Sequence, residues 1–294
     1  MKILVTGATG FVGSALLKCF HKRDEVILLT GKKVDGFVCI NHENYRFTKD
    51  VFANSGIDSI DVVIHIGAVT PKKPEDYKKT GIFLDNIRTT LHLLDNLPNI
   101  PSKFIFISSV DIYEKANSIV DESTQFQTKN MYGMSKLICE KILSERSKQD
   151  GFVLQILRLG NIYGPGEEVY DKIVGTFVKR AIRNEEIVIL SDGSEKRNIL
   201  YVDDCCEAII KALDLEGGVG PINLVSSHEI TVLELAELIV KLTGSLSQIV
   251  VKNECKGRED RYDAGKFVKY LGKEKTELEE GIKNTIKHFR RMYE

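Results

Sequence analysis

The sequence predicts an α/β fold, a doubly wound parallel sheet followed by a smaller C-terminal α/β lobe. Three observations support this prediction. Short continuous apolar runs alternate with helical patterns, which is typical of parallel strands buried on both faces. A glycine-rich turn, Gly7-Ala-Thr-Gly-Phe-Val-Gly13, directly follows the first apolar run. After Gly164-Pro-Gly166 the regular alternation loosens, which indicates a second lobe.

The first lobe is predicted from apolar runs of strand length that are separated by helical patterns. We expect strands at 2–6, 25–30, 61–66, 103–108 and 152–158, with a weaker strand near 44–47. The helices between them are expected at 11–20, with an end near residue 23, and at 81–97 and 131–148.

The second lobe is predicted from shorter and less regular elements. We expect helices at 171–183, from 203 onward, and at 231–243, 263–271 and 276–292, with strands at 186–190, 198–202, 222–225 and 248–251. This pattern predicts a first domain over 1–165, to which 198–222 returns, and a substrate-binding lobe over 166–197 and 223–294. That lobe would lie over the carboxyl edge of the sheet, where open α/β folds bind ligands.

The first twenty residues contain a strand, a glycine turn and the beginning of a helix. This order predicts a Rossmann-type dinucleotide-binding unit. Gly7 would allow a tight turn, Gly10 would let a pyrophosphate approach the backbone, and Gly13 would let the helix lie close to the strand. The free amides at the start of that helix would attract the phosphates.

Tyr132 and Lys136 are four residues apart, a spacing that places both side chains on one face of a helix. An ammonium near a phenol favours the phenolate, so we expect Lys136 to lower the pKa of Tyr132 toward neutrality. A phenol with such a pKa could exchange a proton while a hydride moves.

The Gly-x-x-Gly-x-x-Gly turn and the Tyr-x-x-x-Lys pair together resemble the short-chain dehydrogenase/reductase superfamily. The chain length and the later motifs are similar to its extended branch of nucleotide-sugar epimerases, dehydratases and reductases, the NAD-dependent epimerase/dehydratase family. The resemblance implies that Ser109 polarises and orients the substrate oxygen, that Tyr132 is the general acid/base, and that Lys136 lowers its pKa and holds a ribose hydroxyl. His65, inside a predicted strand, is interpreted as a packed structural histidine.

The resemblance also implies a set of residues that bind the dinucleotide. Asp50 would contact the adenine and Asn86 would lie near the active site, while the strand end at Ile66 would lie along the nicotinamide. Relatives that prefer NAD carry an acid where this chain has Thr30-Gly-Lys-Lys33. We therefore expect NAD or NADP, with the two lysines tilting the expectation toward NADP. The predicted cofactor-binding residues are Gly7, Thr9, Gly10, Phe11, Val12, Gly13, Thr30, Lys32, Lys33, Asp50, Val51, Ile66, Gly67, Ala68, Asn86, Tyr132 and Lys136.

The predicted substrate-binding residues are Ser109, Asn161, Arg197 and Arg258. The resemblance assigns the last three to a substrate diphosphate, with Asn198 nearby, and arginine suits this role because its planar fork holds phosphate oxygens in pairs.

Several reactions remain open. Dehydratases of this family carry an acid after the position of Ser109, but this chain has Val110, which cannot transfer a proton, so dehydration is disfavoured. We expect hydride transfer at a sugar carbon of a nucleotide-linked sugar, as an epimerase or a 4-keto-sugar reductase. The alternatives are an NAD(P)H-dependent reductase of a small non-nucleotide ketone and a non-catalytic protein that senses dinucleotides.

The composition of the chain limits the kinds of partner that we expect it to bind. The net charge of −1 gives no indication of a nucleic-acid partner, and no segment has the apolar length of a membrane span. The six cysteines, at 19, 39, 139, 205, 206 and 255, lack the spacing of a zinc site, so no metal is expected. We expect a cytoplasmic protein. Relatives pair through the helix that carries Met134, Leu137, Ile138 and Ile142, so a homodimer is expected.

Overall fold

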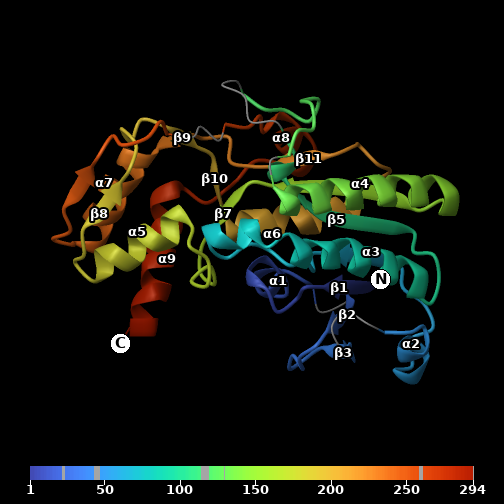
Figure 1. Cartoon of the computed structure of the whole chain (residues 1–294). Helices are drawn as coiled ribbons and strands as arrows, with labels where there is room; N and C mark the ends of the chain where they lie inside the picture. Colours follow the sequence, from blue (N-terminus) through green and yellow to red (C-terminus); the bar gives the residue numbers. More distant parts are fainter. Residues whose placement is uncertain (22–23, 43–46, 114–118, 129, 258–260, 294) are drawn as a thin grey trace.

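The computed structural model describes residues 1–21, 24–42, 47–113, 119–128, 130–257 and 261–293 (Figure 1). A sheet of seven parallel strands lies at its centre, with the strand order β11-β6-β5-β4-β1-β2-β3. The strands are β1 (Lys2–Thr6), β2 (Glu25–Thr30), β3 (Val38–Asn41), β4 (Val62–His65), β5 (Lys103–Ser109), β6 (Val153–Leu159) and β11 (Ile222–Leu224).

Both faces of this sheet are buried, as its continuous apolar strands predict. Side chains alternate along β1, so that Ile3 and Val5 enter one core cluster while Leu4 enters the other. The cluster around Ile3 includes residues of α1 (Phe11–Leu16) and α6 (Val202–Lys211). The cluster around Leu4 includes residues of α2 (Asp50–Asn54), α3 (Leu84–Asn96) and α4 (Met131–Asp150). The two faces are therefore covered by different sets of helices, and the fold is a Rossmann-like α/β fold.

The ends of the long helix α4 are set by local sequence. Asn130 precedes the helix, and its side chain accepts a hydrogen bond from the Gly133 amide at 2.8 Å. Gly151 ends the helix in the left-handed region with φ +82°, where glycine carries no steric cost. These two signals place Tyr132 in the first turn, at the carboxyl edge of the neighbouring strands.

A second group of elements lies beside the sheet, at the left in Figure 1. Three small strand pairs, β7–β10, β9–β12 and β8–β13, accompany its helices. Its elements are β7 (Asn161–Tyr163), α5 (Ile173–Ile182), β8 (Ile187–Ile189), β9 (Lys196–Arg197), β10 (Ile199–Tyr201), β12 (Ile230–Thr231), α7 (Val232–Thr243), β13 (Ile249–Val251) and α9 (Leu278–Tyr293), while α8 (Gly265–Leu271) contacts β11 and α6.

Some predicted elements differ from the structure. The first helix ends at Leu16, although its apolar pattern was expected to run to residue 20 and the helix to end near residue 23, and β3 and α2 were not predicted. The weaker strand expected at 44–47 falls mostly on residues outside the described part of the chain, and Phe47 itself is in no strand. Strand β11 extends the large sheet at the boundary that we drew at residue 222, and our division of the chain into two domains stays a prediction.

The described residues contain no helix that is long and apolar enough to span a membrane.

Candidate active site

The candidate site lies where β1, β4 and β5 end, because these adjacent parallel strands open at the same edge of the sheet. The glycine turn follows β1, Gly67 follows β4, and Ser109 ends β5. The turns after β1 and β4 touch closely. The Gly67 amide donates to Thr6 Oγ1 at 2.9 Å, and a Cβ on Gly7 would lie 2.6 Å from Gly67 Cα.

The glycine turn has the shape that the sequence predicts. Gly7 has φ +71°, a region that favours glycine. A Cβ on Gly13 would lie 2.1 Å from the Gly7 carbonyl oxygen, so only glycine lets α1 lie this close to β1. A Cβ on Gly10 would meet only that oxygen, at 3.3 Å, and Thr9 and Gly10 are exposed. The open backbone above Gly10 fits a pyrophosphate, while Phe11 is buried and Val12 is half-buried behind it.

Tyr132 lies beside Ser109 at this edge. The Ser109 side chain hydrogen-bonds the Tyr132 phenol and also accepts from the Asp111 amide at 3.1 Å. The ring of Phe83 packs against that of Tyr132 with the centroids 5.7 Å apart. Tyr132 keeps some exposed surface, but its phenol is surrounded so closely that burial raises its pKa above the usual value. The charge of Asp111 raises this pKa further, while the Ser109 hydrogen bond lowers it.

The predicted electrostatic role of Lys136 therefore does not appear in this arrangement. Its Nζ donates to the Ile107 carbonyl at 2.7 Å and lies 4.9 Å from the centre of the Phe106 ring. Burial lowers the pKa of Lys136 to about 8. The ammonium is engaged by β5, and the net direction of the Tyr132 pKa is upward, opposite to our expectation.

Asn86 fixes the backbone of the segment after β4, which contains Ile66, Gly67 and Ala68, and His65 is the last residue of that strand. The Asn86 side chain accepts from the Val69 amide at 2.6 Å and donates to the Val69 carbonyl and to Ser135 Oγ, both at 3.1 Å. Its polar atoms thus join α3, this segment and α4. His65 hydrogen-bonds Thr6 and Thr90, and burial lowers its pKa to about 3. It is a neutral, packed side chain.

Sequence reasoning missed three further polar side chains that reach this region. Tyr77 Oη donates to Asp111 Oδ2 at 3.5 Å. Tyr170 packs near Phe11 with ring centroids 6.3 Å apart, and its hydroxyl lies 3.4 Å from Thr70 Oγ1. Lys172 Nζ lies 5.3 Å from the Tyr170 ring centre. No spacing rule connects these residues, because separate loops bring them together.

Lys172 has acidic neighbours that partly offset the effect of burial on its pKa. Burial lowers the pKa of Lys172, while the charges of Glu167 and Asp111 act in the opposite direction. Glu167 is fully buried, accepts from the Gly164 amide at 3.3 Å, and has its pKa raised to about 7 by burial. The 164–172 segment therefore brings a lysine and a carboxyl group with a raised pKa to the edge of the site.

The remaining predicted cofactor residues belong to the end of β2, the loop after it and the start of α2. Thr30 ends β2, is buried, and accepts from the Lys32 amide at 3.2 Å, while Lys32 and Lys33 are exposed. Asp50 is exposed and accepts from Thr48 Oγ1 at 3.4 Å at the start of α2. Val51, next to it, packs against the core cluster around Leu4. Nothing in these contacts tests a role in binding a dinucleotide.

Two of the predicted substrate residues, Asn161 and Arg197, lie in the small strand pairs. Asn161 begins β7 opposite Ile199, and Arg197 lies in β9, where it approaches Glu195 at 3.9 Å. Arg258 falls outside the described residues. A cavity of about 780 Å³ adjoins this region. Its lining consists of Asp192, Ser194, Glu195, Asn253, Glu254, Cys255, Lys256, Gly257 and Arg261.

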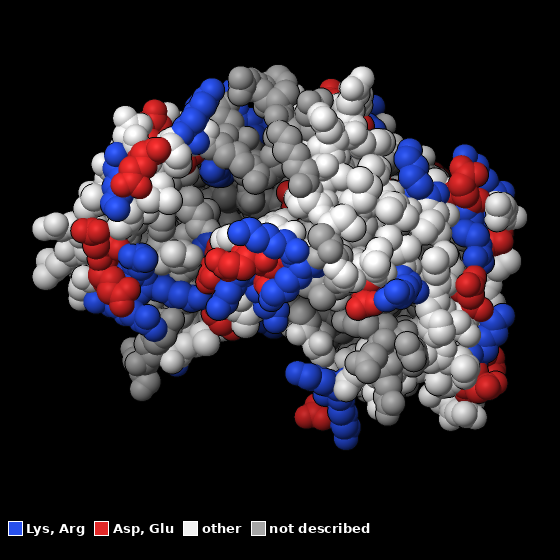
Figure 2. All heavy atoms as spheres, viewed as in Figure 1, with Lys and Arg blue, Asp and Glu red and all other residues white. Residues whose placement is uncertain are grey.

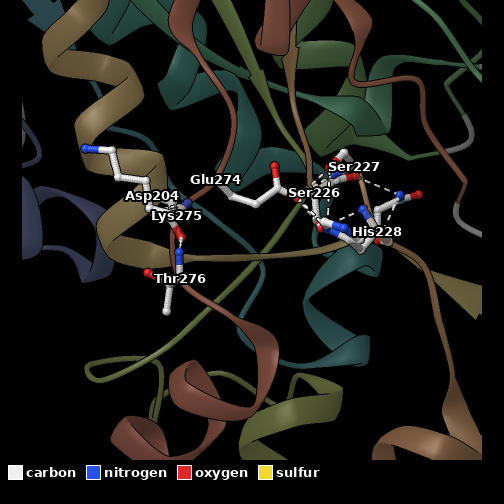
Figure 3. A network of polar contacts seen from close by, with 8 residues as sticks. Asp204, Ser226, Ser227, His228, Glu274, Lys275 and Thr276 are labelled. Atoms are coloured by element: carbon white, nitrogen blue, oxygen red, sulfur yellow. Dashed lines mark hydrogen bonds and ion pairs between the residues drawn. The ribbon is translucent and has the colours of Figure 1, made fainter.

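Asn198, expected near the substrate, is buried and joins three segments of the chain, and its place near a substrate stays a prediction. Its amide donates to the Ser226 carbonyl at 2.8 Å and accepts from the Tyr262 amide at 2.9 Å. Figure 3 shows the adjoining network, in which the Glu274 carboxylate faces Ser226, Ser227 and His228. Glu274 Oε1 accepts from Ser226 Oγ at 2.9 Å and from the Ser227 amide at 2.8 Å. These contacts fasten the loop after β11 to the turn between α8 and α9.

Among the residues that the structure describes, no three His, Cys, Asp or Glu side chains are grouped so that they could hold a metal ion.

Comparison with known proteins identifies related sequences over the whole chain. The model of the NAD dependent epimerase/dehydratase family matches residues 3–224. UDP-glucuronic acid decarboxylase 3 of Arabidopsis thaliana is 25% identical over 308 residues, which cover 99% of this chain and 89% of that protein. UDP-glucuronic acid decarboxylase 1 of Xenopus tropicalis is 26% identical over 310 residues, which cover 100% of this chain and 73% of that protein.

Solved structures agree in fold. UDP-glucose 4-epimerase from Thermotoga maritima, determined with UDP-glucose, has a TM-score of 0.88 and 27% identity, with full coverage of both chains. UDP-glucuronic acid 4-epimerase from Bacillus cereus, determined with NAD, has a TM-score of 0.84 and 22% identity, again with full coverage, and shows the shared fold. The resemblance drawn from the glycine turn and the Tyr-x-x-x-Lys pair is thereby confirmed, and the chain belongs to the NAD dependent epimerase/dehydratase family.

Proposed function

We propose that this protein transfers a hydride between NAD(P) and a sugar carbon of a nucleotide-linked sugar, with 4-epimerisation as the favoured reaction and 4-keto-sugar reduction as the close alternative. The observation that carries the proposal is the contact of Ser109 with the Tyr132 phenol at the edge where the glycine turn opens. The relative of Thermotoga maritima, at 27% identity, is a UDP-glucose 4-epimerase, which supports epimerisation.

The bound dinucleotide would supply the hydride acceptor and donor, held by Gly7, Gly10 and Gly13. The protein's own groups then handle the proton. Because burial keeps the Tyr132 phenol protonated, it is ready to donate to a keto oxygen, and Ser109 would hold that oxygen in place. The oxidative half-reaction, which comes first in an epimerase, would need the Tyr132 oxygen in its deprotonated form to take the hydroxyl proton, and the same phenol would then return that proton to the keto oxygen.

The nucleotide half of the substrate would occupy the cavity of about 780 Å³ in the second lobe. Its volume lies within the range of small-molecule sites. Arg197 and Arg261 lie at this cavity or in the strand beside it, and they offer the guanidinium groups that a diphosphate requires. Asn161 and Arg258 stay predictions for the same role.

A second candidate reaction is decarboxylation of a nucleotide-linked sugar acid. The Arabidopsis and Xenopus relatives carry this activity in their names. Lys172 lies near Asp111, which in turn acts on Tyr132, so a cation is available close to the reacting centre. Oxidation of the hydroxyl at C4 would place a ketone β to the carboxylate, and such acids lose CO2.

One experiment separates these reactions. The purified protein is incubated with UDP-glucose, UDP-glucuronic acid and their 4-keto forms, with NAD or NADPH, and products are followed by NMR and mass spectrometry. An epimer of unchanged mass supports epimerisation, net NADPH consumption supports reduction, and loss of CO2 supports decarboxylation. Absence of all three with a dinucleotide bound would leave a sensing protein or a reductase of a small non-nucleotide ketone.

Tyr132→Phe tests the assigned chemistry directly. Loss of the hydroxyl should reduce turnover by about 100- to 10,000-fold, the usual contribution of general acid–base catalysis. Dinucleotide affinity, measured by calorimetry, should change little, because the glycine turn is untouched. Tyr77→Phe serves as the control, since it removes a nearby hydroxyl that contacts Asp111 only at 3.5 Å. Equal losses in both variants would contradict the assignment.

The choice between NAD and NADP rests on the loop after β2. Exposed Lys32 and Lys33 could meet the additional phosphate of NADP, whereas the family name specifies NAD. We propose that both dinucleotides bind, and parallel affinity measurements on the wild type and on Lys32→Glu/Lys33→Glu test the contribution of the lysines. The variant should lose affinity for NADP alone.

A homodimer is proposed from the outer face of α3 and α4, which lie side by side in Figure 1. Leu84 and Leu91 on α3 and Met134 and Ile138 on α4 are exposed. In Figure 2 the surface over the N-terminal part of α4 carries few charged side chains, whereas charged side chains gather toward its C-terminal end. Leu137 and Ile142, from the same predicted arc, instead pack inward. A cytoplasmic location stays a prediction.

A further inference from the structure

Two cysteines meet where α1 packs against α6. Cys19 follows the end of α1 and Cys206 lies within α6, and the two helices lie next to each other in Figure 1. Cys206 Sγ lies 3.7 Å from the Val12 carbonyl oxygen, and Cys19 Sγ lies 3.8 Å from the Ala15 carbonyl oxygen. Val12 and Ala15 are one turn apart on α1, so the same stretch of helix holds both sulfurs.

The two thiols also contact each other, since their side chains form a hydrogen bond. Cys206 is fully buried, whereas Cys19 is half-buried and reachable from solvent. The hydrogen bond with Cys206 is the largest cause that lowers the pKa of Cys19, and the nearby Lys18 acts in the same direction. Burial, Asp203 and Glu207 act against them. An accessible thiol with a lowered pKa beside a second thiol is the arrangement typical of redox-sensitive pairs.

We propose that Cys19 and Cys206 form an oxidisable pair that closes to a disulfide when the protein meets hydrogen peroxide. The Cys19 thiolate attacks one peroxide oxygen, the O–O bond breaks, and Cys19 becomes a sulfenic acid while hydroxide leaves and takes up a proton. The sulfur of Cys206 then attacks the Cys19 sulfur, the S–O bond breaks, and a second water leaves. Two thiols and one peroxide thus give one disulfide and two waters.

The Cys19–Cys206 disulfide would link the segment at the end of α1, the helix that follows the glycine turn, to α6. It would join residues 19 and 206 across most of the chain length, so the cross-link should restrict the unfolded state strongly and raise the midpoint of thermal unfolding by several degrees. The remaining cysteines provide contrasts. Cys255 is exposed without a thiol neighbour among the described residues, and burial raises the pKa of Cys205 to about 12.

Peptide mapping tests the proposal on the wild-type protein itself. The protein is treated with hydrogen peroxide, free thiols are alkylated, and the non-reduced digest is analysed by mass spectrometry. We expect a Cys19–Cys206 peptide pair, loss of two free thiols, and recovery of both with dithiothreitol. The thermal midpoint should rise on oxidation and return on reduction.

Single substitutions give the matched controls. Cys19→Ser should abolish both the cross-link and the shift in thermal midpoint, while Cys255→Ser should leave both intact. In Cys206→Ser, Cys19 should proceed to sulfinic acid, because the second thiol is missing. The proposal is overturned if peroxide converts Cys19 of the wild type to sulfinic acid without a disulfide, or if Cys206 pairs with another cysteine. It is also overturned if all six thiols remain reduced after peroxide treatment, in the wild type as in Cys255→Ser.

Discussion

Replacing Glu140 by glutamine should destabilise the protein by about 3 kcal/mol, because it leaves the guanidinium of Arg158 buried without a counter-charge. Arg158 Nη2 lies 2.8 Å from Glu140 Oε2 and Nε lies 3.0 Å from Oε1, and the two side chains are only 2% and 5% exposed. Arg158 also donates to Tyr113 Oη at 2.6 Å. Solvent cannot replace the lost charge at such a site.

The pair matters for the site because of its place on α4. Tyr132, Lys136 and Glu140 are spaced four residues apart, so they form one stripe along the helix. Arg158 belongs to β6, and its bonds to Glu140 hold this stripe against the sheet. The substitution should therefore lower turnover as well as stability, although Glu140 itself does not reach the reacting atoms.

The magnitude can be converted into a thermal shift. At about 2.1 cal/mol/K per residue, a chain of 294 residues has an unfolding entropy of about 0.6 kcal/mol/K, so a loss of about 3 kcal/mol lowers the midpoint by about 5 °C. Differential scanning calorimetry measures this. Glu145→Gln on the same helix is the control, because its pair with Lys148 is 65% and 71% exposed and should contribute less than about 1 kcal/mol.

The double variant Glu140→Leu/Arg158→Met completes the argument, since removing both charges should be less damaging than removing one. The reasoning would be refuted if Glu140→Gln lowered the thermal midpoint no more than Glu145→Gln does. It would also be refuted if the double variant were about 3 kcal/mol less stable than Glu140→Gln.

Three further predictions concern the glycine turn, acid stability and assembly. Gly13→Ala should abolish dinucleotide binding measured by calorimetry, because its Cβ would lie 2.1 Å from the Gly7 oxygen, whereas Gly81→Ala, which meets nothing within 4 Å, should bind normally. Unfolding free energy should fall on acidification between pH 6.5 and about 3 by up to about 1.4 kcal/mol per pH unit, because the unfolded chain protonates His65 while the folded chain, with its pKa lowered to about 3, does not. In urea titrations, the unfolding free energy of His65→Asn should fall less steeply with decreasing pH, and an unchanged pH dependence would argue against this role of His65. Ile138→Glu should convert a dimer to a monomer in light scattering, and an unaltered mass would place any interface elsewhere.

Much of the fold was predictable because each core strand is a continuous apolar run, and the runs at 2–6 and 25–30 match β1 and β2 residue for residue. Strand β3 was missed for a physical reason. Val38-Cys-Ile-Asn41 is an edge strand with one fully buried residue, Ile40, so it lacks the apolar run of a central strand. The first helix was predicted too long because its apolar pattern continues beyond Leu16, where the backbone already turns.

The candidate site was predictable only in part. Glycines and the Tyr132–Lys136 pair are recognisable because a local spacing encodes their geometry. Tyr170 and Lys172 carry no such signal, since their approach to Phe11 and Asp111 depends on how the 164–172 segment folds back. That path is set by contacts such as the Asp171 amide donating to the Lys72 carbonyl at 2.8 Å, which join segments a hundred residues apart.

The electrostatics of Tyr132 show why spacing alone predicted the wrong direction. A helical spacing of four brings Lys136 to the same face as Tyr132, but it does not say which acceptor the ammonium will take. The Ile107 carbonyl offers a hydrogen bond at 2.7 Å and the Phe106 ring offers its face, so the cation is directed into the sheet. Asp111, two residues beyond Ser109, faces the phenol instead, and its negative charge acts with burial to raise the pKa of Tyr132. Asp111 itself has Lys172 of the 164–172 segment as a neighbour, so the charges around Tyr132 are set by tertiary structure and not by the local motif.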